Sequence, residues 1–165
     1  MIRLNKEAPN YFEGYLSNGK PITEENITAM IESAKVSMPQ GTTWNTDDKY
    51  DYRSFVIDDR GANNVGGCGS FSASLSDYIF GKDAPVIRHQ NFDQLKVGDV
   101  IWMKDSSTGA DHVFMVTGFG NNKYIGDYFS RGEGNANSVV HWDVQDYIFR
   151  WSATKLAESY IYSRY

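Results

Sequence analysis

The chain has 165 residues, a formal net charge of −5 at pH 7 and one cysteine. This length suits one domain with its own hydrophobic core, and a single cysteine excludes an intramolecular disulfide. The negative charge, without any run of Lys or Arg, argues against a nucleic-acid partner. No stretch approaches the roughly 18 apolar residues of a membrane span, so we expect no membrane-spanning segment.

The first third of the chain is predicted to hold an arm, a helix and a long loop. Residues 1–22 carry turn signals without a sustained period and are expected to lie on the domain as an N-terminal arm. Thr23 is a typical helix start, and Pro39 ends the helix. The apolar residues between them recur at helical spacing: Ile27, Met30, Ile31 and Ala34. Residues 40–67 are rich in Asp, Asn, Gly and Thr, which predicts a long loop with an extended piece at 55–57.

Cys68 opens the next predicted helix, which Gly81 ends. Four residues form its apolar face at i, i+4, i+7 and i+8: Phe71, Leu75, Tyr78 and Ile79. The N-terminal end of a helix stabilises an anion, so a thiol in the first turn is biased toward the thiolate. Glycines on both sides of Cys68 leave the sulfur open to a substrate carbonyl group. The alternative interpretation is a buried cysteine that packs as a small hydrophobe.

The second half of the chain predicts a sheet. Strands are expected at 100–103, 112–119, 124–129 and 139–142, with a tight turn at 120–122 between the second and the third. A loop over 131–135, a short helix from Asp143 to Trp151 and an edge strand over 159–165 complete the pattern. Helices precede strands, so the predicted fold class is α+β. N-terminal helices pack on one side of an antiparallel sheet, in a single domain over residues 1–165.

A cysteine on a helix and a later histidine at the start of a strand are the pair that a thiol nucleophile requires. His112 lies 44 positions after Cys68 (112 − 68) and is predicted to take the thiol proton and later to protonate the leaving amine. Asp127 lies on the partner strand of the same predicted hairpin, where cross-strand neighbours come within about 5 Å at Cβ. Asp127 is therefore predicted to orient the His112 ring, with His141 as the alternative third member.

The remaining histidine, His89, lies in a predicted loop and is interpreted as solvated or as part of a groove wall. Three scattered histidines and one cysteine lack the close spacing of metal ligands, so neither a metal nor a cofactor is expected.

Three segments together resemble a known family. They are Gly67-Cys68-Gly69-Ser70-Phe71, Leu95-Lys96-Val97-Gly98-Asp99-Val100-Ile101-Trp102 and His112-Val113-Phe114-Met115-Val116-Thr117-Gly118. In this order and spacing they resemble the papain-like NlpC/P60 and CHAP superfamily of cysteine peptidases and amidases, over roughly residues 25 to 130 and the late strand. The resemblance implies a papain-like NlpC/P60-type core. It also implies that Cys68 is the nucleophile, that His112 is the base and that Asp127 lies close to the orienting residue.

The chain departs from this family pattern at three positions. Gly67 stands where many members have Asp, and Trp44 stands near the place of a tyrosine beside the active site. A strict alignment selects Gly126, one residue before Asp127, as the third member.

Two loops that flank the predicted site are expected to bind substrate. The loop over 42–67 leads directly into Cys68, and the loop over 131–135 follows soon after Asp127. Aromatic side chains of the first loop are predicted to wall a groove: Trp44, Tyr50 and Tyr52. Arg131 and Glu133 of the second loop are predicted to bind the charged termini of a short peptide. The alternative is that both loops are solvated covers.

The resemblance implies a thiol hydrolase that cleaves amide bonds, with peptides or cell-wall peptidoglycan as substrate. Two alternatives stay open: a non-catalytic binding module on the same fold, and a transglutaminase-like acyl transferase. A secreted or cell-wall location is the corresponding expectation, although residues 1–6 are too short and polar to be a signal peptide themselves. The sequence gives no indication of the oligomeric state.

Overall fold

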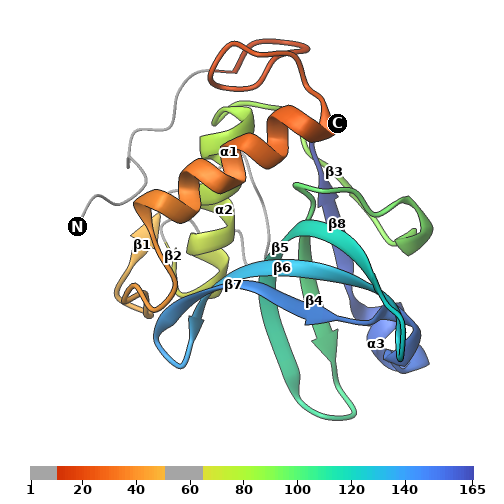
Figure 1. The fold of residues 1–165 in the computed structure, drawn as a ribbon. Coiled ribbons are helices and arrows are strands. Elements are labelled where there is room, and N and C mark those ends of the chain that lie inside the picture. The colour runs from red at the N-terminus through yellow and green to blue at the C-terminus, as the bar shows by residue number, and fades with distance from the viewer. Residues whose placement is uncertain (1–10, 51–64) are drawn as a thin grey trace.

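The computed structural model describes residues 11–50 and 65–165, which form an α+β fold around a six-stranded antiparallel sheet (Figure 1). The described α-helices are α1 (Glu24–Ser37), α2 (Cys68–Phe80) and α3 (Ala153–Glu158), and the short 3₁₀ helices are η1 (Phe92–Gln94) and η2 (Ile148–Arg150). None of the helices in these two ranges is long and apolar enough to cross a membrane.

The sheet has the strand order β3-β8-β4-β5-β6-β7. Its strands are β3 (Ile87–His89), β4 (Val100–Asp105), β5 (Ala110–Asn122), β6 (Gly126–Ala136), β7 (Val139–Asp146) and β8 (Tyr160–Ser163). A separate two-stranded sheet joins β1 (Lys49–Tyr50) to β2 (Val65–Gly66), directly before α2.

Both predicted N-terminal helices are confirmed. Thr23 caps α1, because its hydroxyl oxygen accepts a hydrogen bond of 3.1 Å from Asn26 N–H. The predicted apolar stripe of α1 is buried: Ile27, Met30, Ile31 and Ala34. The second helix begins at Cys68 and ends before Gly81, whose φ of +96° stops the helix. Figure 1 shows α1 and α2 together on one side of the sheet.

Helical segments cover both faces of the sheet, so the prediction of helices on one side is incomplete. Successive residues of a strand point to opposite faces. On β5, Val113 and Met115 belong to the core that α1 and α2 complete. Phe114 and Val116 belong to a second core, together with Trp151 and residues of η1, η2 and α3. The central strands are therefore buried on both faces.

Three strand predictions need correction. The strand predicted at the edge over 159–165 is β8, which lies inside the sheet between β3 and β4. The predicted tight turn at 120–122 lies within β5, and the turn instead falls after Asn122, which pairs with Gly126. The predicted loop over 131–135 is part of β6.

The N-terminal arm is described from residue 11 onward. Leu16 is fully buried, and Ser17 N–H donates a hydrogen bond of 2.9 Å to the carbonyl oxygen of Ile79. This part of the arm is therefore docked on the C-terminal end of α2, as expected. The extended piece predicted at 55–57 lies outside the described residues.

Candidate active site

Cys68 is the first residue of α2, and the residue before it is held by three hydrogen bonds. The carbonyl oxygen of Gly67 accepts from Trp44 Nε1 and Ser70 Oγ, each at 2.9 Å, and from Phe71 N–H at 3.1 Å. These bonds connect the first turn of α2 to the core, because Trp44 also packs edge-on against Phe71 with ring centroids 5.3 Å apart. The position of the thiol is thus fixed from the buried side of the helix.

Position 67 requires glycine. Its φ of +89° with ψ of −147° is a backbone conformation that residues with a side chain rarely adopt. A Cβ atom there would also lie 3.1 Å from Asn135 Nδ2. Glycine in place of the Asp of the pattern that this segment resembles therefore has a local structural reason.

His112 and Val113 meet the cysteine where β5 separates from β6. The described pairing of these two strands ends at Met115 and Gly132. Beyond that point the Cys68 thiol lies close enough to the His112 side chain and to the backbone N–H groups of Val113 and Gly69 for all three to lower its pKa. The structure therefore places the Cys68 thiol beside the His112 ring.

Glu133 is the residue that orients the histidine. His112 Nε2 lies 2.8 Å from Glu133 Oε2, and Glu133 is only 5% exposed. With Nε2 bound to the carboxylate, Nδ1 is the ring nitrogen left for the Cys68 thiol. A buried carboxylate beside the ring also favours its protonated form.

Cys68 and His112 shift each other's pKa values in opposite directions. Burial would raise the pKa of the Cys68 thiol, but hydrogen bonds from His112 and from the two backbone N–H groups, with the His112 charge, lower it. Burial would lower the pKa of His112, whereas its hydrogen bonds to Cys68 and Glu133 and their negative charges raise it to about 9. Both shifts run in the direction that favours a thiolate paired with an imidazolium, the reactive form of a cysteine nucleophile.

The pKa of Glu133 is lowered, which favours the carboxylate beside the positively charged His112 ring. Burial would raise it, but the hydrogen bond from His112 and the charges of Arg131, His112 and His141 lower it below the ordinary value. Arg131 Nε lies 3.2 Å from Glu133 Oε2 as an ion pair without hydrogen-bond alignment. Arg131 Nη1 also donates a hydrogen bond of 3.0 Å to Asp146 Oδ2.

The prediction that Asp127 orients His112 is wrong. Asp127 pairs across the hairpin with Asn121, whose side-chain amide donates a hydrogen bond to the Asp127 carboxylate. Nine residues of β5 separate Asn121 from His112 (121 − 112), which is about 30 Å of strand at roughly 3.3 Å per residue. The turn falls after Asn122, which places Asp127 opposite Asn121 and away from His112.

His141, the alternative third member, does not contact His112 either. His141 pairs with Glu133 across β6 and β7, but its Nδ1 lies 2.9 Å from Gln40 Nε2 and its Nε2 lies 3.0 Å from the carbonyl oxygen of Ala136. His89 lies on β3, at the other end of the strand order, where its Nδ1 accepts a hydrogen bond from Asn91 N–H.

The residues predicted to bind substrate have mainly structural partners. Trp44 and Tyr50 are 5% and 6% exposed, so neither walls a groove. The Tyr50 hydroxyl donates a hydrogen bond of 2.7 Å to Asp77 Oδ2 in the core. Tyr52 lies outside the described residues. Arg131 and Glu133, predicted to bind peptide termini, are paired with each other and with residues of the sheet.

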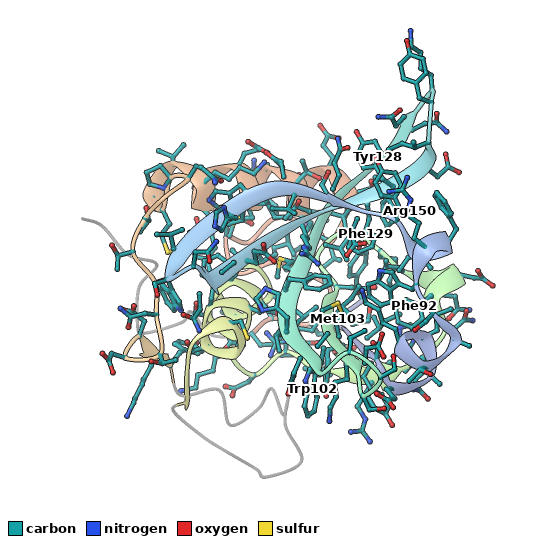
Figure 2. All side chains as sticks on the ribbon, turned by 90° about the horizontal axis from the view of Figure 1, so that it is seen from below. Phe92, Trp102, Met103, Tyr128, Phe129 and Arg150 are labelled. Carbon is teal, nitrogen blue, oxygen red and sulfur yellow. The ribbon has the colours of Figure 1, made fainter. Side chains whose placement is uncertain are left out.

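A surface hollow of about 490 Å³ lies away from the cysteine, among η1, η2 and the outer part of β6. Figure 2 labels three of its lining side chains, Phe92, Tyr128 and Phe129, on this side of the sheet. Asp127 also lines it, whereas Cys68 and His112 do not. The hollow is therefore separate from the candidate active site.

Comparison of the chain with models of protein families, with curated proteins and with solved structures found no match in any of the three. Within residues 11–50 and 65–165, no group of three or more His, Cys, Asp or Glu side chains is arranged to hold a metal ion. The side chains at the site are the Cys68 thiol, the His112 imidazole and the buried Glu133 carboxylate.

Proposed function

We propose that this protein is a thiol hydrolase that cleaves amide bonds through Cys68, His112 and Glu133. The observation that carries the proposal is the 2.8 Å contact between His112 Nε2 and the buried Glu133 carboxylate, with the Cys68 thiol at the start of α2 near enough to the same ring for His112 to lower its pKa. A nucleophile, a base and a group that orients the base are the three parts that covalent acyl transfer requires.

In the first half of the proposed reaction, Cys68 Sγ attacks the carbonyl carbon of the amide. The electron pair of the C=O bond moves to oxygen, and the backbone N–H of Cys68 donates to the oxyanion, because N–H groups of the first helical turn have no partner inside the helix. His112 then gives its proton to the leaving nitrogen, the C–N bond breaks and a thioester remains.

In the second half, His112 acts as a base. It takes a proton from a water molecule, the resulting hydroxide attacks the thioester carbon, and the C–S bond breaks with release of a carboxylic acid. The thiolate and the imidazolium are then restored. Glu133 holds the ring in one orientation through both halves of the cycle and stabilises its positive charge.

The proposed substrate class is peptide stems or crosslinks of the bacterial cell wall, in a secreted or wall-associated protein with a papain-like core. Its support is the resemblance of the segments around Cys68, Asp99 and His112 to the NlpC/P60 and CHAP pattern. Two departures from that pattern, Gly67 and Trp44, do not argue for loss of catalysis, because both residues position the first turn of α2.

The test is release of soluble muropeptides from purified peptidoglycan by the wild-type protein and by Cys68→Ala. The proposal predicts release by the wild type and a loss of at least about 100-fold in the variant. Equal release by both proteins would contradict the mechanism. Addition of an amine donor separates hydrolysis from acyl transfer: a hydrolase yields free carboxylic acid, whereas a transferase yields the substituted amide.

A further inference from the structure

Arg131 lies behind Glu133 on the same strand. The register of β6 on β7 shifts between the two residues, yet their side chains meet: Arg131 Nε lies 3.2 Å from Glu133 Oε2. The Arg131 guanidinium group lies 4.5 Å from the centre of the Phe114 ring, and the same ring is 6.0 Å from that of His112. Phe114 is fully buried and offers a rigid surface to both groups.

Asp146 fixes the other end of the guanidinium group. Asp146 pairs with Phe129 across β6 and β7, so it is diagonal to Arg131, within reach of a long side chain. Its Oδ2 accepts from Arg131 Nη1 at 3.0 Å, and its Oδ1 accepts from Trp151 Nε1 at 3.0 Å and from Tyr147 N–H at 2.7 Å. Asp146 is therefore itself immobilised by the segment that follows β7.

We propose that Arg131 is a positioning residue of the active site, anchored by Asp146 and Phe114, which holds the Glu133 carboxylate ionised and directed at His112. This inference rests on the proposed function and adds Arg131 and its two anchors to the site. Three successive ion pairs then link His112 to Glu133, Glu133 to Arg131 and Arg131 to Asp146.

A planar guanidinium group suits this role because it addresses two carboxylates through different nitrogens. Nε faces Glu133 and Nη1 faces Asp146, whereas a lysine ammonium is a single point charge that cannot keep both geometries. Besides Arg131, two ionisable groups act on the Glu133 carboxylate, His112 from β5 and His141 from β7. Removal of Arg131 leaves these two histidines, whose charge depends on pH, beside the carboxylate.

The experiment measures the rate at which iodoacetamide alkylates Cys68 as a function of pH. The variants are Arg131→Met, Arg131→Lys and Asp146→Asn. Arg150→Met is the matched control, because Arg150 is an exposed arginine that packs on Tyr147 and Phe149 rather than on Glu133. Loss of Arg131 raises the pKa of Glu133, so as the pH falls Glu133 becomes neutral at a higher pH than in the wild type. The His112 imidazolium then loses its charged partner, and the Cys68 thiolate that it stabilises is protonated at a higher pH.

We expect the acid limb of the profile in Arg131→Met to move up by roughly one pH unit or more, since an opposite charge within 4–6 Å shifts a carboxyl pKa by about that much. In Arg131→Lys the acid limb returns to its wild-type position, because the positive charge is kept, but kcat on a cleaved peptide stays below the wild-type value with KM unchanged. Asp146→Asn keeps the guanidinium charge, so its acid limb moves less than that of Arg131→Met. Arg150→Met leaves the pH profile of alkylation unchanged.

An acid limb within about 0.2 pH units of wild type in folded Arg131→Met would overturn the inference. If Arg131→Met does not fold, Arg131→Lys and Asp146→Asn decide the question, and wild-type kcat in both overturns it. Different results contradict the two proposals. If the wild-type thiol is alkylated only near the ordinary pKa of a cysteine, the proposed function is contradicted. If the acid limb of the wild type lies at low pH and Arg131→Met does not move it, only the role of Arg131 is contradicted.

Discussion

Trp44 Nε1 donates a hydrogen bond of 2.9 Å to the carbonyl oxygen of Gly67, the residue before the candidate nucleophile. The indole ring is 5% exposed and packs against Phe71 of α2. The Trp44 side chain therefore packs in the hydrophobic core and also holds the backbone of Gly67, the residue next to the thiol. This double role makes the site sensitive to changes in the core.

Trp44→Phe is expected to lower the free energy of unfolding by about 1–2 kcal/mol, from the lost hydrogen bond and lost packing. It is also expected to slow alkylation of Cys68, because Gly67 loses one of the three donors that fix it. Urea denaturation and iodoacetamide kinetics measure the two effects.

Trp142→Phe is the matched control for that variant. Trp142 is also a buried tryptophan in edge contact with Phe71, and its Nε1 donates to the carbonyl oxygen of Met38 at 2.7 Å. It is expected to cost similar stability without slowing alkylation. Equal slowing in both variants would show that general loosening of the core, rather than the Gly67 contact, controls the thiol.

His112→Gln is expected to abolish the low-pH reactivity of Cys68. The His112 hydrogen bond and charge lower the pKa of the thiol, and without them burial moves it toward or above its ordinary value. The alkylation rate at pH 6 should fall at least about tenfold, while the rates at pH 10 should converge. The absorbance of the thiolate near 240 nm gives an independent titration of Cys68. An unchanged titration midpoint of Cys68 in the variant would contradict the ion pair between Cys68 and His112.

Glu133→Gln is expected to lower kcat on a cleaved peptide by about 100-fold or more, because the imidazolium loses its charged partner. Folding lowers the pKa of Glu133 from an ordinary value of 4.5, so its carboxylate stabilises the folded state fully above that pH. That contribution is lost as the pH falls through the lowered pKa. The difference in unfolding free energy between wild type and variant should therefore be constant at neutral pH and should shrink below about pH 4.5.

Asp127→Asn provides the control for Glu133→Gln, since it makes the same chemical change at the carboxylate that the sequence favoured. Asp127 is bound to Asn121 at the far end of the hairpin, so kcat should stay within about twofold of wild type. A loss comparable to that of Glu133→Gln would restore Asp127 to the mechanism.

Tyr50→Phe separates a structural tyrosine from a substrate-binding one. The hydroxyl group bonds to Asp77, which also forms an ion pair of 2.6 Å with Arg164, and both charged groups are buried. Tyr50→Phe should cost about 1 kcal/mol of stability without changing kcat/KM. Asp77→Asn removes the carboxylate that faces Arg164 and should cost about 3–5 kcal/mol. A raised KM in Tyr50→Phe would return Tyr50 to the substrate groove.

The sequence was informative wherever one local pattern decided the structure. The apolar spacing after Thr23 and after Cys68 predicted α1 and α2 with their buried faces. The position of Cys68 in the first helical turn and of His112 near the start of β5 followed from the same patterns. The pair itself was therefore predictable, because each member depends on its own short segment.

The third member was not predictable in the same way, because it depends on a register. The signal at 120–122 looked like a turn, but β5 continues through Asn122 and β6 runs on to Ala136. That shift places Glu133 on a strand beside His112 and moves Asp127 away from it. One misplaced turn changes every cross-strand neighbour. With its turn after Asn122, the hairpin register that pairs Met115 with Gly132 would, if continued, place Glu133 opposite Phe114 and so diagonal to His112, within reach of its long side chain.

The place of β8 between β3 and β4 affects how the chain reaches this fold. Arg88 pairs with Tyr162 across 74 positions of sequence (162 − 88), whereas β5 and β6 meet through a turn that joins Asn122 to Gly126. Closing a long loop costs entropy before its contacts form, and such non-local pairing slows folding. The hairpin that carries His112 and Glu133 is thus built from short-range contacts, and the β3 edge of the sheet is completed only when the most distant segment arrives.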